Sequence, residues 1–454
     1  MFPEEFLERI KKQSYLDSEG LTEALQKPAE VSVRVNRHKW PFPVTGFESV
    51  AWEPEGYYLH GLTLFAPDPL FHAGVYYPQE SSGMFIGEMF RQLTGDMAPM
   101  RVLDLCGAPG GKSTHLSSLL ADDGLLVSNE VIGTRAAILA ENITKWGIGN
   151  TIVTQNDPSR FASLPGFFDV IVADAPCSGE GMFRSPVAVR EWSVANTRLC
   201  SERQRRIVMD AWPALRPGGI LIYSTCTFNP AENEENIEWI RTSTGSESLE
   251  LDVSQMNEIA ELEYKGIRGY GFYPGRVRGN GFFASALRKP HDRPSSLRLP
   301  RKNLTVIPSR IENRIRELVT FDHDRLFMDK DRVVALAAGK GIFSHLSTKL
   351  KVIKSGTVIG DIRKDQLVPA HDLAMSVWQK PGSWPEYDLS PEEAKAFLRH
   401  DLMNPGLVPE GRVLVRYRGV PLGFVNNLGN RINNGYPQSW RLRMDKPENY
   451  SEIL

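Results

Sequence analysis

This chain has little cysteine, no long apolar run and almost no net charge. Its four cysteines in 454 residues are too few for a disulfide framework, which argues against a secreted, disulfide-stabilised fold. No apolar run approaches the roughly 20 residues that a membrane helix needs. The first residues, Met1-Phe-Pro-Glu-Glu5, lack the basic start and apolar stretch of a signal peptide. We therefore expect a cytoplasmic protein that makes no use of a membrane.

A formal net charge of −2 argues against a strongly basic nucleic-acid binder, but the charge is unevenly distributed. Residues 291–454 carry 26 basic and 19 acidic residues, a net charge of +7. Residues 1–290 carry 27 basic and 36 acidic residues, a net charge of −9. This pattern fits a C-terminal third that approaches a polyanion, and it fits a chance imbalance between domains equally well.

Common metal and phosphate motifs are missing as well. The nine histidines form no HExxH pattern and the cysteines form no CxxC pair, so we expect no metal site. The glycine-rich segment Asp104–Ser113 is neither a P-loop nor a dinucleotide fingerprint. A P-loop requires a glycine where this chain has Cys106, and the dinucleotide pattern requires one where it has Pro109.

Residues 71–290 alternate apolar strand-like runs with helical stretches, which is typical of βαβ units and a parallel sheet. We therefore predict an α/β domain there, within a chain long enough for two to four domains. The predicted strands are Arg101–Leu105, Gly124–Asn129, Thr151–Gln155, Phe168–Ala173 and Gly219–Thr225.

The segments on either side of this domain are compositionally different. Residues 1–70 read as an α+β extension, with a helix near residues 4–13 and a strand near residues 31–36. Residues 291–308 are proline-rich and basic, which predicts a linker. Strand-like pieces with glycine turns follow, and we predict an intermediate α+β module at 309–380 and a C-terminal module at 381–454.

Carboxylates follow three of the predicted strands. Glu130, Asp157 and Asp174 stand at successive strand ends, and the glycine-rich loop follows another strand. Ligands of open α/β sheets bind at the carboxyl ends of the strands, where an acidic residue takes ribose hydroxyls. Each carboxylate alone is more often a helix cap or turn residue. Because the loop is not of a pyrophosphate type, the combination favours a sulfonium nucleoside, S-adenosylmethionine.

Two cysteines follow strands in the same way. Cys177 lies in Asp174-Ala-Pro-Cys-Ser-Gly-Glu-Gly181, and Cys226 lies in Tyr223-Ser-Thr-Cys-Thr-Phe228. If the two strands are neighbours, both thiols face one crevice. A thiolate that adds to carbon 6 of cytosine activates carbon 5 toward a methyl donor, and a second group then serves release. Asp174 could bind the cytosine edge, and the residues alone leave open which thiol attacks.

The remaining cysteines predict packing rather than catalysis. Cys200 lies in a helical stretch among arginines, and Cys106 lies inside the glycine-rich loop as a small residue beside the cofactor.

Together, these segments resemble the Sun/Nop-type RNA cytosine-5 methyltransferases over about residues 1–290. The resemblance implies a Rossmann-like class I S-adenosylmethionine methyltransferase fold with an N-terminal α+β RNA-binding extension. It implies that Cys226 is the nucleophile and that Cys177 assists release of the methylated RNA. The implied cofactor-binding residues are Cys106, Gly107, Ala108, Pro109, Gly110, Gly111, Lys112, Glu130, Asp157 and Asp174. Relatives commonly have alanine where this chain has Gly107.

The C-terminal part resembles, more loosely, the extension of the bacterial small-subunit ribosomal RNA enzymes of this family. Its matching segments are Val352–Ile362, Pro369–Met375 and Leu422–Tyr436. This resemblance implies a PUA-like α+β RNA-binding region, 5-methylcytosine formation in 16S ribosomal RNA, and 16S ribosomal RNA or the small ribosomal subunit as partner. We expect a monomer.

Three other functions stay open at this point. They are the same chemistry on transfer RNA, a non-catalytic RNA-binding ribosome assembly factor, and a small-molecule methyltransferase. The acidic first 290 residues suit RNA poorly, so we expect a local basic cleft built from Arg184, Arg190 and the helix Arg198–Arg206.

Overall fold

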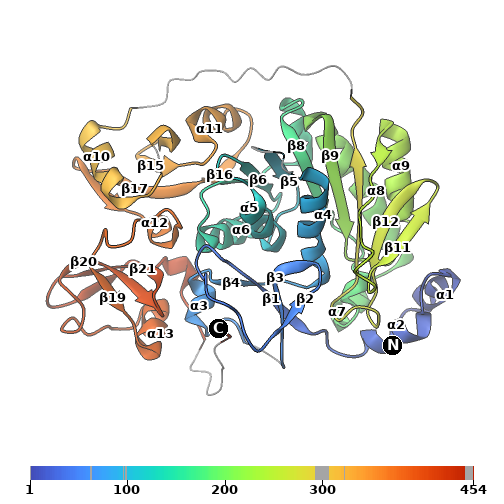
Figure 1. The fold of residues 1–454 in the computed structure, drawn as a ribbon, viewed down its shortest axis with the longest axis horizontal. Helices are drawn as coiled ribbons and strands as arrows, with labels where there is room; N and C mark the ends of the chain where they lie inside the picture. Colours follow the sequence, from blue (N-terminus) through green and yellow to red (C-terminus); the bar gives the residue numbers. More distant parts are fainter. Residues whose placement is uncertain are drawn as a thin grey trace.

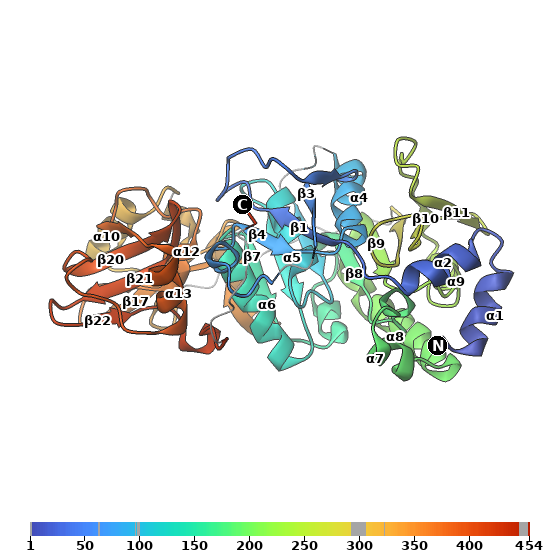
Figure 2. The ribbon, with the colours of Figure 1, turned by 90° about the horizontal axis from the view of Figure 1, so that it is seen from below.

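The computed structural model describes residues 2–61, 64–95, 97, 100–291, 306–321, 323–444 and 453–454. The molecule is elongated (Figures 1 and 2), with the N-terminal helices at one end, a large sheet in the middle and the C-terminal strands at the other end. Among the described residues, no helix combines the length and the apolar character needed to cross a membrane. Most of the predicted linker 291–308 lies outside the described residues.

A ten-stranded sheet forms the middle of the molecule, and its parallel part has the order β7-β6-β5-β8-β9. These strands are β5 (Arg101–Asp104), β6 (Leu125–Asn129), β7 (Thr151–Thr154), β8 (Phe168–Asp174) and β9 (Leu215–Thr225). The strand order confirms the predicted α/β class. The chain order reverses between β5 and β8, so a crevice opens there at the carboxyl ends of the strands.

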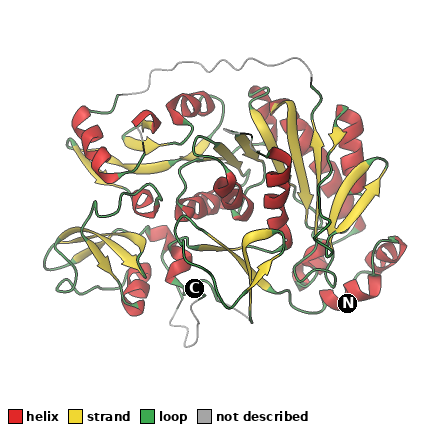
Figure 3. Cartoon of the chain, in the orientation of Figure 1, coloured by secondary structure: helices red, strands yellow, loops and turns green. Residues whose placement is uncertain are grey.

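Antiparallel strands extend the sheet beyond β9. They are β13 (Phe282–Arg288), β12 (Ile267–Phe272) and β11 (Ala260–Tyr264), and β10 (Glu247–Ser248) pairs with β13. Figure 3 shows helices around this sheet. The helices of this part are α4 (Phe85–Thr94), α5 (Gly111–Leu119), α6 (Gly133–Trp146), α7 (Pro186–Glu191), α8 (Val194–Ala211) and α9 (Glu234–Thr244).

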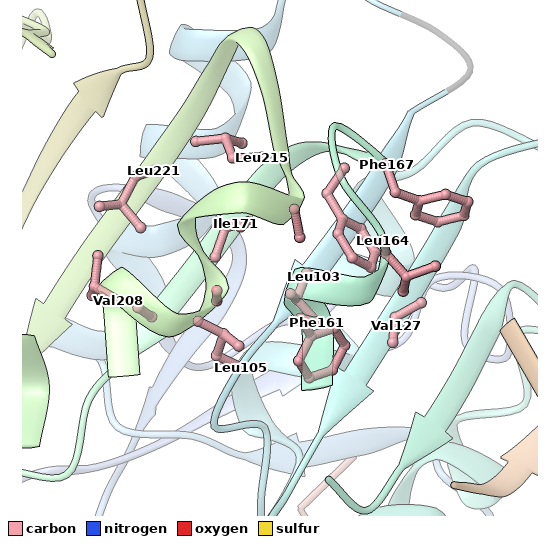
Figure 4. Close-up of a cluster of buried hydrophobic side chains, with 14 of the residues drawn as sticks. Leu103, Leu105, Val127, Phe161, Leu164, Phe167, Ile171, Val208, Leu215 and Leu221 are labelled. Carbon is pink, nitrogen blue, oxygen red and sulfur yellow. The ribbon is translucent and has the colours of Figure 1, made fainter. Parts of the chain in front are cut away.

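Successive strand residues face opposite sides of the sheet, and both sides are buried. Leu103, Ile171 and Leu221 belong to one apolar cluster, together with phenylalanines of the connection before β8 (Figure 4). Their neighbours Val102 and Ile222 belong to a second cluster, on the side of α4. Continuous apolar strands of this kind are expected in a parallel sheet that is covered on both faces.

Residues 309–380 are continuous with the central sheet. Strand β16 (Val352–Ser355) pairs antiparallel with β7, and Leu336 and Phe343 are buried in the same cluster as the strands. The other elements here are α10 (Ser309–Leu318), β14 (Leu326–Asp329), β15 (Arg332–Ala335), α11 (Gly339–Ser347), β17 (Thr357–Arg363), β18 (Gln366–Pro369) and α12 (His371–Met375). This region therefore shares a core with the central domain.

The N-terminal and C-terminal sheets also share a core. Val33 and Tyr57 of the first sheet pack in one cluster with Val413 and Leu422 of the last. The first sheet has the order β2-β3-β1-β4, and the last has the order β19-β20-β21-β22. Their elements are β1 (Val31–Val35), β2 (Glu48–Val50), β3 (Glu53–Leu59), α3 (Pro69–His72), β4 (Tyr76–Pro78), β19 (Glu386–Asp388), α13 (Pro391–Arg399), β20 (Gly411–Tyr417), β21 (Val420–Asn427) and β22 (Ile432–Asn434).

Two N-terminal helices lie apart from that sheet. α1 (Glu4–Lys12) and α2 (Ser18–Leu25) are followed by β1 but pack at the far side of the central domain (Figure 2). Phe6 is fully buried in a cluster with Phe183 and Phe228. These two phenylalanines follow Cys177 and Cys226 in the chain, so α1 supports both cysteine loops.

We predict that Leu336→Ala destabilises the whole protein by about 2–5 kcal/mol, because it leaves a cavity in the shared core. Thermal unfolding should show one transition at lower temperature. The fully exposed Leu402, replaced by alanine, is the matched control and should leave the transition unchanged. A separate early transition with the remainder unaffected would contradict a shared core.

Candidate active site

The ends of β8 and β9 bring the two cysteines together. The strands are parallel neighbours, with Asp174 in register with Ser224. The Sγ atoms of Cys177 and Cys226 lie 3.0 Å apart, and the Cys226 backbone N–H donates to the Cys177 sulfur at 3.3 Å. Both cysteines are free thiols.

A cavity of about 510 Å³ opens beside these sulfurs at the carboxyl ends of the parallel strands. It is lined by both cysteines and by the three carboxylates that the sequence analysis singled out, Glu130, Asp157 and Asp174. Apolar side chains, among them Val131 and Ile132, complete part of the wall. The cavity thus combines thiol, acidic and apolar groups in one place.

The three carboxylates differ in how they are held. Glu130 is buried and accepts the backbone N–H of Ile132 at 3.0 Å. Asp157 caps the turn that follows it, and its hydrogen bonds with Ser159 hold its pKa below the usual range. Asp174 accepts from Ser224 Oγ at 2.7 Å. Glu130 and Asp157 thus each accept a hydrogen bond from a nearby backbone N–H and also line the cavity.

Lys112 forms an ion pair with Asp174 from the first turn of α5. Its Nζ lies 2.8 Å from Asp174 Oδ2 and 5.3 Å from the ring centre of Phe282. Burial lowers the pKa of Lys112, but Asp174 and Cys226 outweigh this effect and raise the pKa above its usual value. Lys112 is therefore positively charged beside Asp174, and Cys226 is among the groups that stabilise this charge.

Only part of the glycine-rich loop faces the cavity. Cys106 and Ala108 line it, whereas Pro109 accepts from Asn142 Nδ2 at 2.8 Å on the outer side. Gly110 has a φ of 125°, a left-handed conformation that glycine adopts without strain, and Gly111 begins α5. These glycines form the turn before α5, from which the Lys112 side chain reaches Asp174.

Gly107 lies against a buried hydroxyl cluster. A Cβ atom at this position would lie 2.1 Å from Ser128 Oγ and 2.7 Å from Ser113 Oγ. Ser113 Oγ donates to Asp104 Oδ2 at 2.6 Å and contacts Ser128 Oγ at 2.7 Å. Because these hydroxyls fill the space of a methyl group, a side chain larger than that of glycine would have to displace them.

The Cys177 thiol holds its proton strongly. The hydrogen bond with Cys226, together with burial, raises the pKa of Cys177 well above its usual value. Cys177 therefore keeps its proton. Burial also raises the pKa of Cys106, and Cys200 is buried on α8, where it packs as expected.

The sequence analysis assigned no role to two buried glutamates that hold the cysteine loops. Glu180 accepts the Phe228 N–H at 3.2 Å and pairs with Arg9 Nη2 at 2.6 Å. Glu232 accepts the Ser178 N–H at 2.9 Å. No pattern in the sequence marks a glutamate as buried.

The arginines of the expected basic cleft fall into two groups. Arg184 and Arg205 are held by the protein itself, since Arg184 donates to Lys27 O and Arg205 to Asn236 Oδ1. Arg190, Arg198, Arg203 and Arg206 are exposed, and the last two line the cavity. Within the described ranges, no group of three or more histidine, cysteine or acidic side chains is arranged to hold a metal ion.

Four family models match the chain in succession. Residues 96–288 match 16S rRNA methyltransferase RsmB/F, and residues 2–81 match the N-terminal domain of 16S rRNA methyltransferase RsmF. Residues 292–377 match the first C-terminal domain of the RsmF rRNA methyltransferase, and residues 385–442 match the methyltransferase RsmF PUA domain.

Individual proteins match over nearly the whole chain. Ribosomal RNA small subunit methyltransferase F of Escherichia coli (strain SE11) is 29% identical over 471 residues, which cover 96% of this chain and 96% of the relative. The protein of the same name from Shigella sonnei matches at the same identity and coverage.

Solved structures match the central part. A methyltransferase homolog protein from Pyrococcus horikoshii is 26% identical with a TM-score of 0.52, covering 63% of this chain and 99% of its own. NSun6 from Pyrococcus horikoshii with SFG is 20% identical with a TM-score of 0.54, covering 64% and 99%. At 20% identity, that structure supports the fold alone.

We predict that Gly107→Ala weakens binding of S-adenosylmethionine by about 1–3 kcal/mol, because the new methyl group displaces Ser128 and the loop. Isothermal titration calorimetry measures the effect. Adding Ser128→Ala removes the closest oxygen and should restore much of the affinity. Unchanged binding by the single variant would show that the hydroxyl cluster tolerates the methyl group.

Proposed function

Because the chain belongs to the RsmF family of 16S ribosomal RNA methyltransferases, we propose that it forms 5-methylcytosine in 16S ribosomal RNA, with Cys226 as the nucleophile. One observation carries the proposal. The two free thiols lie 3.0 Å apart at the ends of neighbouring strands and line the same cavity as three strand-end carboxylates.

The cavity fits S-adenosylmethionine as the cofactor. Its volume of about 510 Å³ lies within the range of small-molecule sites. Glu130 stands where doubly wound folds bind ribose hydroxyls, and Asp157 with the Cys106–Ala108 backbone forms the neighbouring wall. When bound, S-adenosylmethionine supplies an electrophilic methyl group for carbon 5 of the base.

Two contacts prepare Cys226 for attack. In the contact between the two sulfurs we assign Cys177, whose pKa is raised, as the donor to Cys226, and the Lys112 ammonium stabilises negative charge on Cys226. The thiolate then adds to carbon 6 of cytosine, and the electron pair of the ring double bond becomes available at carbon 5. Asp174, held by Lys112 and Ser224, is placed to accept a hydrogen bond from the exocyclic amine of the base.

Release requires the reverse movement of electrons. A base removes the proton from carbon 5, the ring double bond re-forms, and the carbon–sulfur bond breaks so that Cys226 leaves as a thiolate. While Cys226 is bound to RNA its sulfur carries no charge, so the largest of the causes that raise the pKa of Cys177 is lost, although burial and Glu232 still raise it. Cys177 releases its own proton to solvent in this state, and the resulting thiolate takes the proton from carbon 5, which restores the starting pair of a Cys177 thiol and a Cys226 thiolate.

The proposed target of the methyl group is 16S ribosomal RNA. Matches to an RsmF N-terminal domain and to an RsmF PUA domain favour 16S ribosomal RNA over transfer RNA. A non-catalytic assembly factor would have no need for the thiol pair and the Lys112–Asp174 ion pair at one cavity.

We predict that Cys177→Ala, expressed in bacteria, accumulates covalently bound RNA. A slow band should appear on a denaturing gel, disappear with nuclease and be absent from Cys177→Ala/Cys226→Ala. Sequencing the attached RNA identifies the target, and 16S ribosomal RNA is the expected result. A folded single variant that binds S-adenosylmethionine and forms no adduct would contradict the assignment of the thiols, and transfer RNA would contradict the substrate.

We also predict that Arg190→Gln/Arg198→Gln weakens RNA binding, because both side chains are exposed next to the catalytic loops and outside the cavity. The slope of log K against log salt should fall by about 0.7 for each lost phosphate contact on a single strand. Arg268, which pairs with Glu250 and Glu263, is the control position for glutamine substitution. An unchanged slope would remove these arginines from the RNA path.

A further inference from the structure

The short distance between the two sulfurs is maintained beyond the end of the sheet. The last backbone hydrogen bond of the β8–β9 ladder joins the Ala175 N–H to Ser224 O at 3.0 Å. Cys177 lies two residues further on, in a loop without ladder bonds to β9. One backbone bond, from the Gly181 N–H to Cys226 O at 2.9 Å, still joins this loop to the second cysteine loop, and side chains hold the residues next to Cys177.

Hydrogen bonds hold the residues on both sides of Cys177. The Ser178 N–H donates to Glu232 Oε2 at 2.9 Å, and Gln204 Nε2 donates to Pro176 O at 3.1 Å. Gln204 Nε2 also donates to Glu232 Oε2 at 2.9 Å, which joins the two contacts. The Ser178 hydroxyl adds a bond to Glu232 and one to Thr227 Oγ1 at 3.0 Å, so the second cysteine loop is included.

The network requires an acceptor at position 232. The Asn236 amide donates to Gln204 Oε1 at 2.7 Å, which leaves Gln204 Nε2 as a donor. Glu232 therefore faces donors only: the Ser178 N–H, the Ser178 hydroxyl and the Gln204 amide. A carboxylate accepts all of them, whereas a glutamine would direct its own N–H groups at one.

Packing alone does not account for a buried glutamate at position 232. Its side chain is fully buried, and burial raises its pKa to about 7. The neighbouring buried Glu180 pairs with Arg9, but among the described residues no ion pair with Glu232 is present. A buried carboxylate without a cation destabilises a fold, and the group it holds most directly is the Cys177 loop.

We propose that Glu232 is a positioning residue that, through Ser178 and Gln204, holds Cys177 in place for release of methylated RNA. Glu232 does not line the cavity, so it acts through Cys177 rather than on the base. This inference rests on the proposed function, because it needs Cys226 as nucleophile and Cys177 as the group that serves release.

Glu232→Gln in the full chain tests the proposal. We expect a folded protein with unchanged affinity for S-adenosylmethionine, Cys226-dependent covalent RNA on a denaturing gel, and kcat lower by about 10- to 100-fold. A displacement of about 1 Å costs on the order of 100-fold in rate. kcat/KM for RNA should stay near the wild-type value, so that KM falls together with kcat, since attack by Cys226 precedes the slowed step. Loss of stability alone would not trap an adduct.

Glu235→Gln is the matched control, because Glu235 is exposed three residues further on. It should release RNA like the wild type. In the Cys177→Ala background, Glu232→Gln should add no further adduct, since both changes disable the same group. Additional trapping there would overturn the proposal, because Glu232 would then act independently of Cys177.

Two outcomes separate this inference from the proposed function. If Cys177→Ala forms no adduct, the proposed function fails. If Cys177→Ala traps RNA while Glu232→Gln turns over like the wild type, the inference alone is overturned. Should Glu232→Gln fail to fold, Ser178→Ala decides, since it removes the hydroxyl bonds and keeps the backbone bond to Glu232. Trapped RNA supports the proposal, and wild-type release contradicts it.

Discussion

The parallel pairing of β8 with β9 is the constraint on which the site depends. It places two loops, from chain segments about 50 residues apart, at the same point of the sheet edge, and each loop carries a cysteine. The switch in strand order beside β5 opens the crevice at that edge. The carboxylates at the ends of β6, β7 and β8 line the same cavity because of this strand order.

Contacts outside the sheet keep this edge rigid. α1 packs Phe6 against the phenylalanines that follow both cysteines, and Arg9 neutralises the buried Glu180. Glu232 holds the Cys177 loop from the other side. The N-terminal segment is therefore part of the catalytic scaffold as well as a candidate for RNA binding. Its own sheet packs with the C-terminal strands at the opposite side of the central domain.

The sequence predicts the parts of this site that depend on local patterns. Apolar runs that end in Asn129 or Asp174 mark strands and their carboxyl ends, so the position of the carboxylates and thiols follows from the α/β rule. The sequence does not indicate that Glu232 is buried, because glutamate is usually exposed and the groups that donate hydrogen bonds to Glu232 come from distant segments. The sequence does not predict the pairing of β16 with β7 either, since a four-residue strand has the same pattern whether it joins the central sheet or belongs to a separate module. The glycine-rich loop predicts close backbone contact with the cofactor. In the structure, Gly110 and Gly111 lie at the start of α5 instead. The domain boundaries, the roles of the site residues and the monomeric state stay predictions.

The central claim is that Cys226, and not Cys177, bonds to the base. Its most direct test uses a 16S ribosomal RNA substrate that contains 5-fluorocytidine, with the wild-type protein and S-adenosylmethionine. Fluorine at carbon 5 leaves no proton to remove, so the adduct persists after methyl transfer. Mass spectrometry of the proteolysed complex should find the nucleotide on the peptide that contains Cys226. A nucleotide on the Cys177 peptide, or no adduct from an RNA that binds, would contradict the account.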